Sequence, residues 1–253
     1  MVVIPGPVTF VMGSPSTEAD RDNAEKQHKR RIGRTFALAA KPVTVEQYRK
    51  FDTGYQLPAV YTRTADLPVV GTSWHEAAAY CNWLSKEEGI DEDQWCYEIK
   101  DGQVIRLKAN YLNLTGYRLP TEAEVEYATR AGALTSRYYG ETEELLPKYA
   151  WYLTNSQQKT WPVGSLKPNN FGVFDMQGNV FAWCQERYKS YPRGEESGED
   201  KGDIDSINAQ DNRVLRGGTF DNRASFVRSA FRNSDVPAYR LNVIGFRPAR
   251  TYR

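Results

Sequence analysis

The stretch that decides the fold of this 253-residue chain is Tyr117-Arg118-Leu119-Pro120-Thr121-Glu122-Ala123-Glu124. The hydroxyl of Thr121 and the carboxylate of Glu124, three residues later, form the pattern of a capping box, which predicts that a helix begins here. The helix should carry Val125 and Ala128 on one face and end at Gly132. Arg118 precedes it, and its five fixed donors suit a buried guanidinium that bridges irregular loops.

Two further helices are predicted upstream of this stretch by the same chemistry. One should follow Thr44 and run to Phe51, and the other should begin at Ser73, with Glu76 in the reciprocal capping position. After Gly132 the sequence consists of short apolar pieces broken by Gly, Pro, Asn and Asp, which is typical of short strands joined by long loops. The segment from Arg193 to Asp205 is rich in Gly, Glu and Asp, and we expect it to be an exposed insertion loop.

Composition predicts a folded protein with a large core. Hydrophobic residues make up 40% and aromatic residues 13% of the chain, and we expect a single domain over residues 1–253. The net charge of +1 predicts no strong attraction to nucleic acid or to an anionic membrane. No stretch is long and apolar enough to span a membrane. The chain enters a strand-like run almost at once, which indicates a domain cut from a longer parent.

The three cysteines, Cys81, Cys96 and Cys184, indicate neither a disulfide scaffold nor a zinc site. Their number is odd and no two have CxxC spacing, so we interpret them as buried, reduced thiols and expect a cytoplasmic protein. The two histidines are His28, in a charged stretch, and His75, in the first turn of a predicted helix. We expect solvated or hydrogen-bonded imidazoles rather than metal ligands at both positions.

A series of short motifs runs in order along nearly the whole chain. They are Val11-Met12-Gly13-Ser14, Pro42-Val43-Thr44, Ser73-Trp74, Ala79-Tyr80-Cys81-Asn82-Trp83-Leu84, Tyr117 to Glu124, Pro162-Val163-Gly164, Pro168-Asn169, Phe171-Gly172, Asp175-Met176, Gly178-Asn179-Val180, Arg213-Val214-Leu215-Arg216-Gly217-Gly218, Arg228-Ser229-Ala230 and Ile244-Gly245-Phe246-Arg247. This order resembles the sulfatase-modifying-factor family. The resemblance implies an α+β protein with the formylglycine-generating-enzyme type of C-type lectin fold, in which Arg118 and Arg247 are buried.

The enzymatic activities of that family require side chains that this sequence lacks. The founding activity, oxidation of a sulfatase cysteine to formylglycine, uses two cysteines of the enzyme that bind copper, but the matching stretch Gly217–Arg228 contains none and places Asn222 near the first ligand. A second branch resembles ergothioneine-pathway sulfoxide synthases, whose iron needs three histidines. The carboxylates Glu122 and Glu126 are expected to be solvated on a helix surface. We therefore predict no catalytic residues and no obligatory cofactor; the alternative is a metal-dependent oxidase of the family with altered chemistry.

A calcium site is the one metal site that the resemblance implies for this chain. Family members carry calcium near Asp175, with backbone oxygens near Gly178 and Val180 and an acidic side chain two residues beyond. Here that last position is Ala182, which removes an oxygen ligand. Calcium is thus a candidate ligand rather than a required one.

The residues after Gln210 differ in composition from the rest of the chain. They include no Lys, Glu, Gln, Met or Trp. Within residues 213–247, a set of scaffold residues alternates with an irregular mixture of aromatic, small and polar side chains. The scaffold residues are Arg228, Ser229, Arg232, Arg240, Gly245, Phe246 and Arg247. This interleaving resembles the variable proteins of diversity-generating retroelements, in which randomised adenines convert an Asn codon into every residue type except those five.

The resemblance implies a variable ligand-binding face between Thr219 and Val243. Its candidate positions are Phe220, Asp221, Asn222, Arg223, Ser225, Phe226, Phe231, Asn233, Ser234, Asp235, Val236, Tyr239, Leu241, Asn242 and Val243. Phe226, Phe231 and Tyr239 are expected to be exposed anchors, because aromatic side chains supply much of the binding energy at interfaces.

The expected partner is a protein or another macromolecular ligand, and no membrane is involved. Nucleic acid is not expected, because most of the nine arginines after Gly202 fall on scaffold positions. Two other interpretations stay open at this point. The candidate positions could be ordinary loop and core residues, or the chain could be an assembly domain whose C-terminal segment packs internally.

Overall fold

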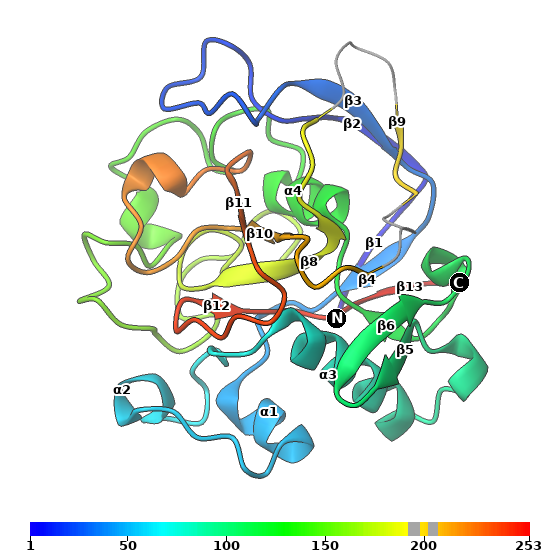
Figure 1. Ribbon diagram of the computed structural model, residues 1–253. Helices are drawn as coiled ribbons and strands as arrows, with labels where there is room; N and C mark the ends of the chain where they lie inside the picture. Colours follow the sequence, from blue (N-terminus) through cyan, green and yellow to red (C-terminus); the bar gives the residue numbers. More distant parts are fainter. Residues whose placement is uncertain (192–197, 202–206) are drawn as a thin grey trace.

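Two four-stranded sheets occupy the centre of the molecule in the computed structural model, which describes residues 1–191, 198–201 and 207–253 (Figure 1). The first sheet has the strand order β1-β4-β13-β7 and the second has the order β11-β10-β8-β12. Their bounds are β1 Val2–Ile4, β4 Phe36–Leu38, β7 Tyr117–Arg118, β8 Phe181–Arg187, β10 Arg213–Arg216, β11 Arg232–Asp235, β12 Ile244–Gly245 and β13 Ala249–Thr251. The first and last strands both pair with β4, so the two ends of the chain close one sheet.

Two smaller sheets flank this centre. One has the order β2-β3-β9, and the other is the antiparallel hairpin β5-β6. Their bounds are β2 Val8–Met12, β3 His28–Ile32, β9 Gly198–Glu199, β5 Tyr97–Lys100 and β6 Gln103–Leu107. All these strands are short, as the breaker-rich sequence predicts.

The three predicted helices are confirmed, with their capping boxes. They are α1 Val45–Phe51, capped by Thr44, α3 Trp74–Glu87, capped by Ser73, and α4 Glu122–Arg130, capped by Thr121. The structure adds α2 Ala59–Thr62 and the short 3-10 helices η1 Glu92–Gln94, η2 Tyr111–Asn113, η3 Leu146–Lys148 and η4 Ala224–Phe226. Within the described ranges, no helix is long and apolar enough to cross a membrane.

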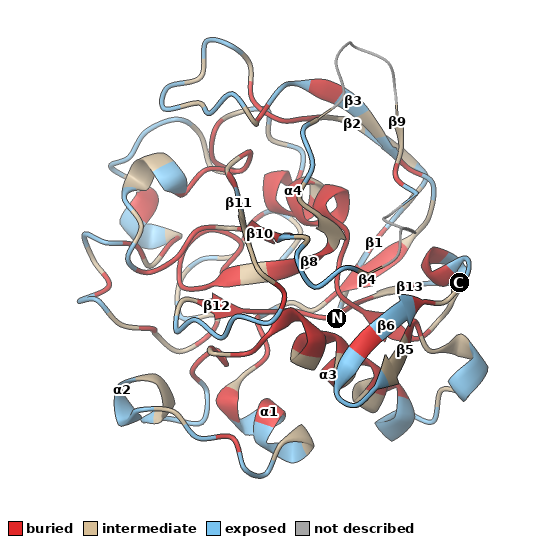
Figure 2. Cartoon of the chain, in the orientation of Figure 1, coloured by how far each residue is buried: buried red, intermediate tan, exposed pale blue. Residues whose placement is uncertain are grey.

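Two fully buried tryptophans fasten α3 to the second sheet. The indole N–H of Trp74 on α3 donates to the carbonyl of Cys184 on β8 at 2.9 Å, and the indole N–H of Trp183 donates to the carbonyl of Thr72 at 2.9 Å. Because each buried N–H has a partner, these large side chains add apolar area without an unpaired donor. Figure 2 shows helix α4 as almost entirely buried.

The predicted burial of Arg118 and Arg247 is confirmed. Arg118 forms a two-pronged pair with Glu124, with both N–O distances at 2.7 Å, and both side chains are excluded from solvent. Arg247 donates to the carbonyls of Ala39, Phe174 and Asp175, and so joins loops that have no regular ladder between them.

The expected insertion loop from Arg193 to Asp205 lies largely outside the described residues. In its described part the expectation is wrong. Gly198 and Glu199 form strand β9 against β3, and the buried carboxylate of Asp200 pairs with Arg34 at 2.5 Å. A charged residue in a Gly- and Glu-rich stretch is thus buried because a distant cation neutralises it.

Candidate ligand-binding face

The C-terminal segment 213–247 alternates between sheet strands and surface loops. It enters on β10, which lies between β11 and β8, and Gly217 and Gly218 then turn the chain with φ of +98° and +75°. Beyond η4 it returns as β11 and ends at β12 (Figure 1). A Cβ at Gly218 would lie 2.9 Å from the carbonyl oxygen of Phe226, so this turn needs glycine for both space and conformation. The sheet strands hold the segment, and the loops between them are displayed.

Arg228 fixes the middle of this segment to the N-terminal part of the chain. Its guanidinium contacts both carboxylate oxygens of Glu25, at 2.8 and 2.7 Å, and the carboxylate of Glu18 at 2.6 Å. It also donates to the carbonyls of Asp20 and Ser225. One buried arginine therefore ties the loop after η4 to a loop more than 200 residues earlier in the sequence.

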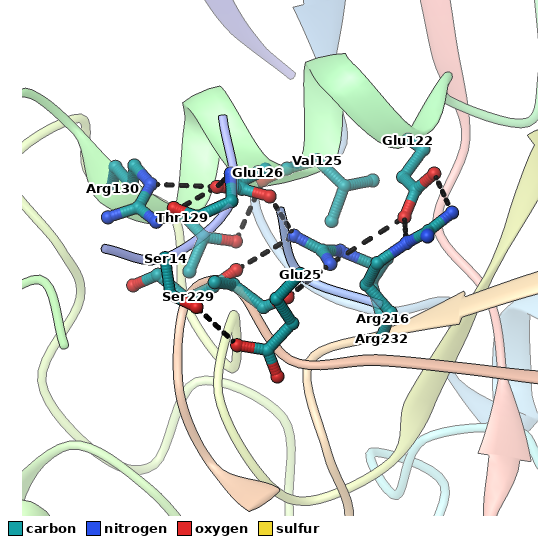
Figure 3. A network of polar contacts seen from close by, with 12 residues as sticks. Ser14, Glu25, Glu122, Val125, Glu126, Thr129, Arg130, Arg216, Ser229 and Arg232 are labelled. Atoms are coloured by element: carbon teal, nitrogen blue, oxygen red, sulfur yellow. Dashed lines mark hydrogen bonds and ion pairs between the residues drawn. The ribbon is translucent and has the colours of Figure 1, made fainter. Parts of the chain in front are cut away.

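Arg216 and Arg232 fix the two strands β10 and β11 to helix α4 (Figure 3). Arg216 contacts Glu126 at 2.5 Å, and Arg232 contacts both oxygens of Glu122 at 2.5 and 2.9 Å. Arg130 also reaches Glu126, at 2.9 Å. These cations and carboxylates form a buried network in which every charge faces an opposite one.

The expectation that Glu122 and Glu126 are solvated is wrong. Both are buried, because β10 and β11 bring arginines onto the face of α4 from which they project. Burial alone would raise the pKa of Glu122, but the charges of Arg232 and Arg216 outweigh it and hold this pKa below its usual value. The two carboxylates therefore hold the C-terminal segment against α4.

The fifteen candidate positions fall into three groups: seven are exposed, seven are half-buried, and one, Phe220, is buried, contrary to the prediction. The exposed positions are Asp221, Arg223, Phe226, Asn233, Tyr239, Leu241 and Asn242. The half-buried positions are Asn222, Ser225, Phe231, Ser234, Asp235, Val236 and Val243. Phe220 is buried at 3% exposure, since its backbone N–H and C=O are bonded to Asn179 and Ser156 and draw it inward. Phe220 thus belongs to the interior of the protein.

Two of the three expected aromatic anchors are exposed. Phe226 is 43% and Tyr239 is 52% exposed. Phe231 is half-buried instead, because its ring lies 6.3 Å from that of Phe181 in the core and 5.0 Å from that of Phe226, measured between centroids. Phe231 therefore packs between Phe226 and the core residue Phe181 and is not an exposed anchor.

Residues far away in the sequence complete the surroundings of the face, and sequence reasoning missed them. The side chain of Asn242 donates to the hydroxyl of Tyr61, and Arg240 contacts both oxygens of Glu76 at 2.9 Å. The backbone N–H of Leu153 donates to the carbonyl of Asn222. Sequence spacing carries no signal for these contacts, because each joins positions dozens of residues apart.

Comparison with known protein families assigns the chain to one of them. The profile described as "Sulfatase-modifying factor enzyme 1-like domain" matches residues 1–252. The chain belongs to this family. The formylglycine-generating enzyme of Streptomyces coelicolor is 30% identical over 203 residues, which cover 72% of the chain and 52% of that enzyme. The serine/threonine-protein kinase pkn1 of Chlamydia pneumoniae is 31% identical over 183 residues, with 72% of the chain and 24% of the kinase covered. The chain thus spans about half, or less, of these relatives.

Two solved structures show the same fold. Treponema denticola variable protein 1 superposes with a TM-score of 0.83 at 27% identity, covering 100% of the chain and 95% of that protein. PvdO from Pseudomonas aeruginosa has a TM-score of 0.75 at 27% identity, covering 99% and 93%. The expected α+β architecture of the C-type lectin kind is therefore confirmed, and a variable protein is among its structural relatives.

The cysteines of this family member lie outside the stretch Gly217–Arg228, which corresponds to the copper ligands implied by the family. Cys81, Cys96 and Cys184 are buried and free. Burial raises the pKa of all three thiols, to about 12 for Cys96. The stretch Gly217–Arg228 itself contains none. These side chains do not fit the copper site that the family implies.

The two imidazoles have structural partners. The Nδ1 of His75 accepts from the backbone N–H of Val104 at 3.1 Å, and burial lowers the pKa of His75 to about 4. His28 is buried, with its Nδ1 3.0 Å from the carbonyl of Lys26 and its ring 4.5 Å from that of Tyr191. Among the described residues, no group of three or more His, Cys, Asp or Glu side chains is arranged to bind a metal ion.

The calcium candidate also lacks a suitable set of donors. Asp175 is buried, its Oδ2 accepts from the backbone N–H of Gly164 at 2.7 Å, and burial raises its pKa. Gly178 packs so closely on Trp151 that a Cβ would lie 2.3 Å from the Trp151 carbonyl oxygen, and Val180 is buried. Calcium takes about six to eight oxygen ligands, whereas Asp175 offers one carboxylate that is already engaged and Ala182 offers none. The residues present do not fit a calcium site of the family type.

Proposed function

We propose that this protein is a non-catalytic ligand-binding module whose binding face is formed by the exposed residues between Thr219 and Val243, diversified by a retroelement. The observation that carries the proposal is that buried arginines and exposed side chains alternate within segment 213–247. Arg216, Arg228 and Arg232 face inward and are held by carboxylates of other elements, while irregular side chains face outward. The likeness to Treponema denticola variable protein 1 supports this assignment.

The chemistry of the side chains supports a binding role over an enzymatic one. Asn222 stands where formylglycine-generating enzymes are expected to hold a thiolate, and amide and hydrocarbon groups are poor ligands for a cuprous ion. We test the enzymatic alternative by incubating the protein with a cysteine-containing peptide, a copper or iron salt and oxygen. Conversion of the peptide cysteine to formylglycine above the level of a protein-free control would overturn the non-catalytic assignment.

The partner that this proposal assigns is a protein or another macromolecule in a reducing compartment such as the cytoplasm. The exposed Tyr239 and Phe226 supply aromatic area, and the exposed Asn233, Asn242 and Arg223 supply hydrogen-bonding groups. Of the nine arginines after Gly202, those at 213, 216, 228, 232 and 247 are buried, which argues against a basic nucleic-acid-binding surface. The three unpaired cysteines agree with reducing conditions.

Two matched libraries test the proposal. In the first, the seven exposed candidate positions are randomised; in the second, Arg216, Arg228 and Arg232 are randomised. We expect most members of the first library to resist proteolysis as the parent does and to yield specific binders on selection, and most members of the second to unfold. Equal loss of folded protein in both libraries would contradict the proposal. Natural diversification predicts, in addition, an adenine-substituted near-copy of the gene's 3′ end beside a reverse-transcriptase gene.

A further inference from the structure

The segment round helix α2, residues 58–66, is weakly held and contacts the candidate face at Asn242. No residue of α2 is buried, its N-cap Pro58 makes no side-chain hydrogen bond, and Val60 is 43% exposed. The segment is fixed at its end by two backbone contacts, from Glu46 N–H to the Ala65 carbonyl and from Val163 N–H to the Asp66 carbonyl. A four-residue helix without buried side chains has little stability of its own.

Among the described residues, two side-chain hydrogen bonds join the α2 segment to the body of the protein. Arg63 donates to the carbonyl of Thr160 at 2.6 Å, and its other terminal nitrogen donates to the carbonyl of Val60 within the segment at 2.6 Å. The second contact joins the hydroxyl of Tyr61 to the side-chain amide of Asn242. Asn242 is one of the exposed candidate positions, so one of the two contacts depends on a residue of the binding face.

We propose that Tyr61 is a further residue of the binding face, a positioning residue that couples the placement of α2 to the identity of residue 242. This inference rests on the proposed function in one respect, that position 242 varies. A side chain at 242 that donates or accepts a hydrogen bond keeps α2 against the body. An aliphatic residue there leaves the Tyr61 hydroxyl without its partner and releases the helix, with Val60 moving away from its present place. Variation at one position thereby changes the outline of the face contributed by residues that do not vary.

The test measures local release of α2 and needs no ligand. The variants are Asn242→Ala, Tyr61→Phe and the double variant, with Asn233→Ala as the matched control, since Asn233 is an exposed asparagine of the same segment with no contact to Tyr61 among its described hydrogen bonds. The readouts are the rate of tryptic cleavage after Arg63 and the exchange rate of the amides of residues 59–63, both followed by mass spectrometry. Loss of one hydrogen bond should raise both rates about two-fold to ten-fold. Circular dichroism confirms that each variant is folded.

Four outcomes decide whether α2 is coupled to residue 242. Equal acceleration in both single variants, with no further acceleration in the double variant, supports the coupling, because both changes then remove the same contact. Unchanged rates in Asn242→Ala and Tyr61→Phe overturn it. Additive acceleration, or equal acceleration in Asn233→Ala, overturns it as well, since release would then not pass through the Tyr61–Asn242 contact. Failure of this test leaves the library experiment untouched, and failure of the libraries leaves the measured coupling intact.

Discussion

Replacing Arg232 by Ala is the perturbation that most directly measures how the C-terminal segment is held. Arg232 contacts both oxygens of Glu122 at 2.5 and 2.9 Å, and its guanidinium lies 3.7 Å from the ring centroid of Tyr191. Removing one partner of a buried ion pair costs about 3–5 kcal/mol, because the other charge is left uncompensated. Glu122 keeps the hydroxyl of Tyr191 at 3.0 Å and Arg216 at 3.6 Å, so we expect a loss near the lower end, about 3–4 kcal/mol.

The matched control for this variant is Arg240→Ala. Arg240 belongs to the same segment and also forms a two-pronged pair, with Glu76, but its side chain is 58% exposed. An exposed pair of this kind contributes about 0–1 kcal/mol. The free energy of unfolding is measured for both variants by urea denaturation, followed by tryptophan fluorescence. A loss below about 1 kcal/mol in Arg232→Ala, or equal losses in the two variants, would refute the argument that burial makes these arginines structural.

Four other predictions concern Glu124, strand β11, the pair Phe226 and Phe231, and the surroundings of Asp175. Burial alone would raise the pKa of Glu124, but Arg118 and Arg34 lower it to about 2. The ionised carboxylate therefore stabilises the fold above the usual pKa of 4.5, and this stabilisation is lost as the pH falls toward 2. Urea midpoints measured from pH 5 to pH 2 should fall less steeply in Glu124→Gln than in the parent. Strand β11 lies at the edge of its sheet in the described chain, and there the side chains of Asn233 and Asp235 accept hydrogen bonds from the N–H groups of Ser234 and Val236 at 2.8 Å. Replacing both by Ala frees these donors for pairing with another strand, so light scattering should show self-association of the double variant. The control variant Asn242→Ala should scatter light as the parent does. Only Phe231 packs on Phe181, so Phe231→Ala should lower the free energy of unfolding by roughly 1–3 kcal/mol and Phe226→Ala by about 0.5 kcal/mol or less. The reverse order in thermal or urea unfolding would contradict the conclusion that Phe231 is the more structural of the two rings. Millimolar calcium should leave the melting temperature unchanged relative to EDTA, and a saturable rise that Asp175→Asn abolishes would show that the donor set near Asp175 had been misjudged.

The parts of the fold that could be predicted from the sequence are those governed by neighbours in the chain. Thr121 and Glu124 are three residues apart, and a capping box depends on that spacing alone, so the start of α4 was predictable. The environment of Glu126 was not, because its partner Arg216 lies 90 residues further along. Helical periodicity shows which residues share a face, but it does not show which charged side chain another strand brings against that face.

The same limit applied to the candidate site. Composition and interleaving singled out the segment as a candidate, and of its predicted scaffold arginines Arg228 and Arg232 are buried, whereas Arg240 is exposed. Phe220 could not be told from Phe226 by type, because its burial follows from backbone hydrogen bonds to Asn179 and Ser156 in distant loops. Tyr61 was missed for a similar reason, since only the folded chain brings it to Asn242.

Two explanations account for the absence of Lys, Glu, Gln, Met and Trp after Gln210: the geometry of buried contacts and diversification through asparagine codons. The structure shows at which positions each one applies. At the buried cationic positions lysine is excluded by geometry. Arg228 makes contacts to two carboxylates and two carbonyls, and an ammonium with three donors could not reach all of them from one point. That argument does not extend to Glu, Gln, Met and Trp at exposed positions such as Arg223, Tyr239 and Asn242, where nothing in the packing forbids them. Their absence from the surface, rather than the absence of lysine from the interior, is therefore the part of the composition that bears on diversification through asparagine codons.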